Sequence, residues 1–150
     1  MKTDPYLCGR PVTMGTRHMA ASSHYLASLA GYDVLEAGGS AADAVIAINA
    51  VLAVVYPHMS GLGGDFFCQV WDPREGQVRA LNASGRSAAR ASIELYRSRG
   101  HAGIIPVRGP LAALTVPGAI DGWWELHQRY GRLDWERLFQ PAIRYAGEGF

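Results

Sequence analysis

The sequence predicts the α+β fold class, with helices packed against a sheet, on three observations. The run at 41–55 is almost wholly apolar and lies between a glycine pair and a proline. Segment 66–72 is rich in aromatic and other apolar residues, and a turn sequence joins it to a second candidate strand at 77–83. Segments with apolar residues at helical spacing flank this unit on both sides. A chain of 150 residues is long enough to form one domain with a buried core.

The first 40 residues are expected to form a lead-in, a strand and a helix. Residues 1–16 are polar and carry proline and glycine, so we expect an irregular lead-in. Residues 17–22 are predicted to form a short strand. Ser23 is a candidate cap for a helix over 24–37, which Gly38 would end at the C′ position.

A buried helix is predicted over 41–55. Ser40 is a favourable N-cap, and Asp43 places a carboxylate near the positive end of the helix. After Asp43 only Asn49 is polar, so we expect the helix to be buried on nearly all sides. Its length of roughly 22 Å is too short to span a bilayer. Pro57 ends it.

The strand at 66–72 is expected to lie in the middle of a sheet. Apolar side chains point to both of its faces: Phe66, Cys68 and Val70 to one, Phe67 and Trp71 to the other. A strand that is apolar on both faces is typical of a position covered by other layers on both sides.

A turn and a second strand follow. Residues 73–76, Pro-Arg-Glu-Gly, have the composition of a turn, and the strand at 77–83 is predicted to pair antiparallel with 66–72. Residues 84–90 are then expected to form a loop at the end of that strand.

The next part of the chain is expected to contain two helices separated by an irregular segment. A short helix at 93–99 is ended by Gly100, and 101–117 is the least regular segment of the chain. A proline before it and Gly131 after it frame a helix over 119–130.

Two features of the C-terminal region follow from helix geometry. Trp123 and Trp124 are adjacent, so they point about 100° apart and at most one of them lies deep in the core. Asp134 is a candidate cap for a further helix, which we expect to be broken at Pro141 and to resume as far as Ala146.

The glycine-rich turn at 61–64, Gly-Leu-Gly-Gly, is not expected to bind phosphate. Phosphate-binding loops run from a strand to a helix N-terminus, whereas here the order is helix to strand and the nearby helix end is the negative one. We expect the glycines to permit close backbone packing and positive φ angles.

Composition and charge argue against several partners. The net charge is +1 with no basic block, so nothing favours nucleic acid or a membrane surface. Cys8 and Cys68 do not make a disulfide framework, and Cys68 is expected in the core. The five histidines show no paired metal-ligand spacing, and His58 is expected to be buried and hydrogen-bonded rather than a catalytic base. The N-terminus has no apolar signal region, so a cytoplasmic location is expected.

A glycine pair that opens an alanine-rich helix, followed by a Pro-His…Ser-Gly…Gly-Gly run and a strand, is found in AGGSAADAVIAINAVLAVVYPHMSGLGGDFF. This segment resembles the large-subunit signature of the gamma-glutamyltranspeptidase family of N-terminal nucleophile hydrolases. The likeness extends to HMAASSHYLASLAGYDVLEAGG before it and to LTVPGAIDGWWELHQRYGRLDWERLFQPAIRYAGEGF after it. It therefore covers about residues 17–150.

The resemblance implies a four-layer αββα sandwich. Residues 17–150 would be the N-terminal portion of a single domain that is truncated before its nucleophile. In the family a precursor cleaves itself, and the new N-terminal threonine uses its own amine as base and its hydroxyl as nucleophile. The threonines of this chain are not placed for that role: Thr3, Thr13, Thr16 and Thr115. We therefore assign no catalytic residue, metal or cofactor here, and expect as partners a small acidic amide and the small subunit of the same precursor.

Substrate binding is the role that the resemblance implies for this part of the chain. In the family an Arg-Glu pair follows the second strand, and its arginine grips the substrate α-carboxylate through a bidentate pair. Ser84 and Gly85 hold those two places here, and Arg86 follows two residues late. We assign Arg86, with Ser84, to substrate binding; the alternative is that Arg86 is a solvated loop residue. Asp65 stands where transpeptidases carry another glycine, and it is expected to cap its turn rather than to bond the backbone around the site.

The resemblance implies an enzyme that hydrolyses or transfers a γ-glutamyl or related acidic acyl group. The acyl-enzyme would form on a threonine outside this segment. Two alternatives stay open: an amidohydrolase for another small acidic amide, oxamate-like or glutaryl, and a degenerate relative without catalytic activity.

Overall fold

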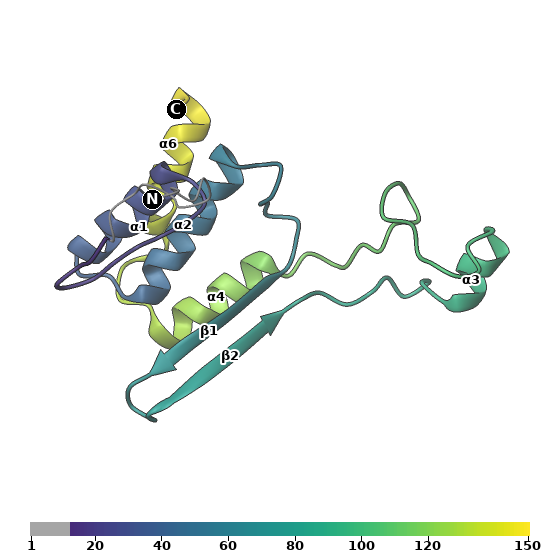
Figure 1. Cartoon of the computed structure of the whole chain (residues 1–150), viewed down its shortest axis with the longest axis horizontal. Coiled ribbons are helices and arrows are strands. Elements are labelled where there is room, and N and C mark those ends of the chain that lie inside the picture. The colour runs from purple at the N-terminus through teal and green to yellow at the C-terminus, as the bar shows by residue number, and fades with distance from the viewer. Residues whose placement is uncertain (1–12) are drawn as a thin grey trace, which may run out of the picture.

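The computed structural model describes residues 13–150, so most of the lead-in expected at 1–16 lies outside the described residues. Its elements are α1 (Tyr25–Glu36), α2 (Ala41–Val55), β1 (Phe66–Asp72), β2 (Gln77–Ala83), α3 (Ile93–Ser98), α4 (Ala119–Tyr130), α5 (Trp135–Leu138) and α6 (Gln140–Glu148). Figure 1 shows a helical body on one side of the β1–β2 hairpin and an extended arm that carries α3 away from it. The predicted α+β class is confirmed. No helix within residues 13–150 is long and apolar enough to cross a bilayer.

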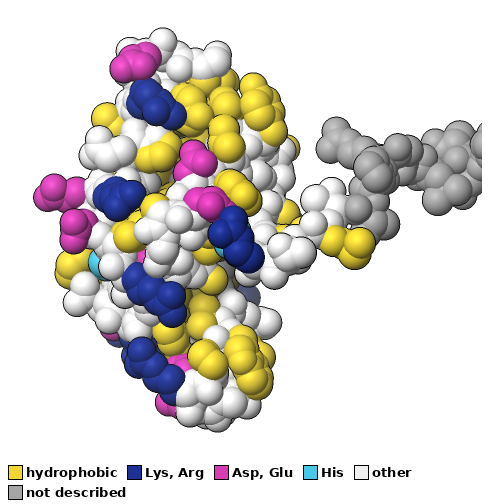
Figure 2. Space-filling view, turned by 90° about the vertical axis from the view of Figure 1, so that its left-hand side faces the viewer, with side chains coloured by type: hydrophobic (Ala, Val, Ile, Leu, Met, Phe, Trp, Pro, Cys, Tyr) yellow, Lys and Arg dark blue, Asp and Glu magenta, His cyan; other side chains and the backbone are white. Residues whose placement is uncertain are grey.

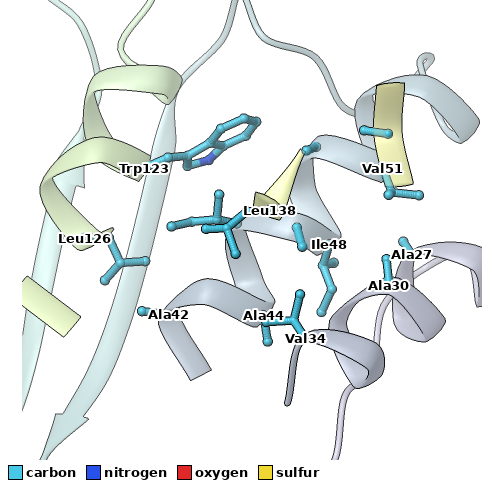
Figure 3. Packing of buried hydrophobic residues seen from close by; sticks show 14 of the residues in the cluster. Ala27, Ala30, Val34, Ala42, Ala44, Ile48, Val51, Trp123, Leu126 and Leu138 are labelled. Carbon is cyan, nitrogen blue, oxygen red and sulfur yellow. The ribbon is translucent and has the colours of Figure 1, made fainter. Parts of the chain in front are cut away.

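Helix α2 forms the centre of the body, as its apolar sequence predicts. Its first turn is closed by a capping box: Ser40 Oγ accepts the backbone N–H of Asp43, and the Asp43 carboxylate accepts the backbone N–H of Ser40. After Ala41, none of its residues is exposed. Side chains from α1, α4 and α5 converge on it in Figure 3, and Ile46, Val51 and Leu138 are fully buried there.

The segment before α1 differs from the prediction. Residues 17–22 form no strand, because no other segment of the described chain pairs with them; Arg17 and His18 instead contact the Glu36 carboxylate at 2.7 and 3.0 Å. The N-cap of α1 is His24, whose Nδ1 accepts the backbone N–H of Leu26, and not the expected Ser23.

The end of α1 is a Schellman motif, as the glycine after it predicts. Gly38 has a φ of 86° and donates its N–H to the carbonyl of Leu35, while Gly39 donates to the carbonyl of Val34. This tight stop turns the chain directly into α2, so that the two helices pack side by side (Figure 1).

Strands β1 and β2 pair antiparallel as predicted, and their register runs from Phe66 opposite Ala83 to Asp72 opposite Gln77. The turn between them is the predicted one, with Gly76 at a φ of 66°. The expectation that β1 is covered on both faces is wrong for the described residues. Phe67 and Trp71 are 63% and 61% exposed, because helices of residues 13–150 pack on the opposite face only.

Helix α4 covers that opposite face of the hairpin. Gly122 brings its backbone so close that an added Cβ would overlap the side chains of Ala83 and Phe66. Trp123 is 3% exposed and meets Phe66 edge to face, whereas Trp124 is 45% exposed. The prediction that only one of the two tryptophans lies in the core is confirmed.

The C-terminal helices are divided at a different residue from the one expected. The break lies at Phe139, and Pro141 lies in the first turn of α6, where its missing N–H costs no hydrogen bond. Asp134 is the N-cap residue of α5, but its side chain makes no capping hydrogen bond. The outer face of this body carries basic and acidic side chains interspersed with apolar ones (Figure 2).

Candidate functional site

The site predicted from the sequence lies at the base of the arm. We define the arm as residues 84–118 and the arm base as residues 84–87 with 115–118. The two legs of the arm are joined there: the backbone N–H of Val116 donates to the carbonyl of Arg86 at 2.9 Å, and Ser87 forms an antiparallel bridge with Thr115. Beyond these contacts the legs separate toward α3 (Figure 1).

The legs approach so closely that two positions require glycine. A Cβ on Gly85 would overlap the carbonyl oxygen of Val116, and a Cβ on Gly118 would overlap that of Ala83. The glycine of the Val-Pro-Gly segment is therefore needed for the contact between the start of α4 and the end of β2.

Asp65 holds both legs with one oxygen. Its Oδ1 accepts the hydroxyl of Thr115 at 2.8 Å and the backbone N–H of Gly85 at 3.3 Å. These partners lie 50 and 20 residues away in sequence. The preferred expectation that Asp65 caps its own turn is wrong, and the alternative, that it bonds the backbone around the site, is the observed one.

The glycine-rich turn lies beside this junction. The carbonyl of Gly64 accepts the N–H groups of Gly118 and Ala119, each at 3.0 Å, so it caps the start of α4. The expected positive φ angles are absent at Gly61, Gly63 and Gly64. Nothing within residues 13–150 crowds Gly61 or Gly63 either, so the expectation of close packing is wrong for both.

The two predicted substrate-binding residues lie together on the outer surface of this loop. Ser84 and Arg86 are both exposed, and the backbone N–H of Ser84 donates to the Asn82 side chain at 2.9 Å. Within residues 13–150 the Arg86 guanidinium has no carboxylate partner.

Other candidate residues do not join the site. His58 is exposed and lies against the ring of Tyr56, at 4.2 Å between centroids, so the expectation of a buried histidine is wrong. Cys68 is half-buried under α4 and forms no disulfide within residues 13–150, and burial raises the pKa of its thiol. No group of histidine, cysteine and acidic residues within 13–150 is arranged to hold a metal ion.

Sequence reasoning missed the structural roles of Thr115 and Val116. The available signal is the Val-Pro-Gly segment at 116–118. A hollow of about 570 Å³ opens between the legs beyond Ser87 and Thr115 and is lined mainly by apolar residues of the arm.

Three comparisons place this arrangement among known proteins. Residues 27–150 match the family model described as Gamma-glutamyltranspeptidase. The chain is 44% identical over 137 residues to the glutathione hydrolase-like YwrD proenzyme of Bacillus subtilis (strain 168), covering 91% of this chain and 26% of that protein. It is 45% identical over 141 residues to the oxamate amidohydrolase proenzyme of Klebsiella pneumoniae subsp. pneumoniae, again covering 91% and 26%. The cephalosporin acylase from Bacillus halodurans superposes with a TM-score of 0.89 at 39% identity, over 100% of this chain and 27% of that one.

The fold is thus that of an N-terminal nucleophile hydrolase, and the chain supplies part of its four-layer αββα sandwich. The chain belongs to the gamma-glutamyltranspeptidase family. It spans about a quarter of the length of the curated relatives named above.

Proposed function

We propose that the complete protein is an amide-cleaving enzyme that hydrolyses or transfers a γ-glutamyl or related acidic acyl group. The acyl group would be carried on a threonine outside residues 1–150, exposed by self-cleavage of a precursor. The segment described here would be the front part of the large subunit. Its partner would be the small subunit from the same precursor.

The family match over residues 27–150 supports this reaction class, and the names of the relatives point the same way. Both relatives are named as proenzymes, and their names give glutathione hydrolase-like and oxamate amidohydrolase activities. Glutathione and oxamate share an amide and a carboxylate. An acidic amide is therefore the substrate class that we propose.

The observation that carries the substrate proposal is the exposed Arg86 guanidinium at the arm base. A planar guanidinium pairs with both oxygens of a carboxylate and so fixes its orientation as well as its position. The backbone is held on both sides of the Arg86 side chain. Asp65 accepts the N–H of Gly85, and the carbonyl of Arg86 accepts the N–H of Val116. Ser84, on the same loop, offers a hydroxyl to the same ligand.

A second candidate function, hydrolysis of a small acidic amide other than a γ-glutamyl one, is favoured by Gly85. The resemblance places a glutamate of the transpeptidases at this position. With the backbone found here no side chain fits, because its Cβ would overlap the Val116 carbonyl oxygen. The loop therefore offers no acidic side chain to a substrate α-amino group, and a substrate without that group, such as oxamate or a glutaryl amide, suits it better.

The test is a substrate panel with the complete purified protein. We expect release of the acid from at least one of γ-glutamyl p-nitroanilide, glutaryl p-nitroanilide, glutathione and oxamate. A preference for the two substrates without an α-amino group would support the second candidate. Absence of acid release from all four would overturn the proposed function and favour the degenerate, non-catalytic relative.

A further inference from the structure

We propose that Asp65 is a positioning residue that determines how Arg86 receives the substrate carboxylate. This inference rests on the proposed function, because it assigns Asp65 to the same site. Asp65 need not touch the substrate. It would act through the backbone of the arm base.

The geometry of three hydrogen bonds carries the inference. Arg86 is fixed by the bond between its carbonyl and the backbone N–H of Val116, at 2.9 Å. Asp65 Oδ1 holds the residue before each of these partners: Gly85 before Arg86, at 3.3 Å, and Thr115 before Val116, at 2.8 Å. One carboxylate oxygen therefore braces both ends of the contact that orients Arg86.

The hydrogen bonds of Asp65 are needed because the arm base has little packing of its own. Ser84 and Arg86 are exposed, and the next residues of the outgoing leg are exposed as well. Their position therefore depends on hydrogen bonds rather than on a surrounding core. Gly85 also has to lie against Val116, where a Cβ atom would overlap the Val116 carbonyl oxygen. Asp65 and Gly85 therefore act together to position the arm base. Both are departures from the pattern that the resemblance leads us to expect.

The negative charge of Asp65 is not what positions Arg86 in this proposal. A negative charge beside Arg86 would disfavour an acidic substrate, so the contribution has to come from hydrogen-bond acceptance. Asparagine offers the same acceptor oxygen to Gly85 and Thr115 without the charge. The pair Asp65→Ala and Asp65→Asn therefore separates positioning from electrostatics.

The experiment measures kcat and KM of the complete protein with its best acidic amide. We expect Asp65→Ala to raise KM about tenfold with a smaller change in kcat, because one hydrogen bond is lost on each leg. Asp65→Asn is expected to keep KM within about twofold of wild type. Glu75→Ala is the matched control, since Glu75 is also a turn carboxylate, lies at the far end of the hairpin and contacts Arg79.

A second measurement tests the hydrogen bond between Asp65 and Gly85 and does not require an active enzyme. Hydrogen exchange of the Gly85 amide is expected to be slow in wild type and Asp65→Asn, and faster in Asp65→Ala. An active wild type in which Asp65→Ala leaves both KM and Gly85 exchange unchanged would overturn this inference and leave the proposed function intact. Equal damage by Asp65→Ala and Asp65→Asn would also overturn it, because the charge would then matter. A wild-type protein without activity would overturn the proposed function. The exchange rate of the Gly85 amide would then be the only test of whether Asp65 holds the arm base in place.

Discussion

Asp43 and Arg132 are joined across 89 residues of sequence: the fully buried Asp43 carboxylate accepts the backbone N–H of Arg132 at 2.9 Å. The same oxygen, Oδ2, accepts the N–H groups of Leu133 and Ser40. The other oxygen, Oδ1, lies 3.7 Å from Nε2 of His127. One side chain therefore caps α2 and also fixes the loop between α4 and α5 against it.

Removal of this carboxylate is predicted to destabilise the body strongly. Asp43→Ala leaves three partly buried N–H groups without their acceptor, and we expect a loss of roughly 3 to 5 kcal/mol in the free energy of unfolding. Asp43→Asn keeps one acceptor oxygen and is expected to lose clearly less. Urea unfolding of the complete protein measures both, and equal stability of the two variants would contradict the assignment.

Gly85→Ala is predicted to disrupt the arm base, because the new methyl group would overlap the Val116 carbonyl oxygen. The backbone has to move, which shifts Arg86 and raises KM for an acidic amide. Gly103→Ala is the matched control on the same arm, since nothing within residues 13–150 lies near its Cβ position. A normal KM in Gly85→Ala would show that the close approach is absent from the working protein.

Arg86→Ala is predicted to weaken the use of carboxylate-bearing substrates. Loss of one bidentate pair should cost about 2 kcal/mol, or about 30-fold in kcat/KM, mainly through KM. Arg90→Ala tests whether any loop arginine would serve, because Arg90 is also exposed on the same loop. Unchanged kinetics in Arg86→Ala would assign that residue to the solvated surface.

Acid should weaken the contact between the hairpin turn and α4. The backbone N–H of Arg74, and then the Tyr130 hydroxyl at 3.1 Å, hold the pKa of Asp72 below its ordinary value of 3.8. A depressed folded-state pKa contributes stability that is present above the unfolded pKa and is lost as the pH falls below it. Asp72→Asn is therefore predicted to flatten the fall in melting temperature below about pH 4. An unchanged slope would contradict this linkage.

The contribution of Tyr130 to stability should show the opposite dependence on pH. Burial and the neighbouring Asp72 carboxylate raise its pKa above the ordinary value of 10.0. Its contribution is present below pH 10.0 and is lost as the pH rises through the folded-state pKa. Spectrophotometric titration of the phenol should therefore detect one late-titrating tyrosine that disappears in Tyr130→Phe.

Local signals in the sequence were sufficient to predict the main helices and strands. The bounds of α2, β1, β2 and α4 agree with the prediction. Each is marked by residues that act within a few positions, such as the capping box at Ser40 and the glycine turn at Gly76. The register of the hairpin follows from its short turn.

The predictions that failed depend on contacts distant in sequence. The exposure of Phe67, Trp71 and His58 depends on which layer packs opposite them, and no helix of residues 13–150 does so. The role of Asp65 depends on Gly85 and Thr115, which only the folded chain brings to it. The assignment of Arg86 and Ser84 to substrate binding stays a prediction.

We propose that these residues are the front part of an enzyme that cleaves its own precursor. Gel electrophoresis and N-terminal sequencing of the complete purified protein, incubated alone, test it most directly. We expect two fragments, the second of which begins with threonine, together with release of chromophore from an acidic anilide. A single intact chain that releases no chromophore would contradict it.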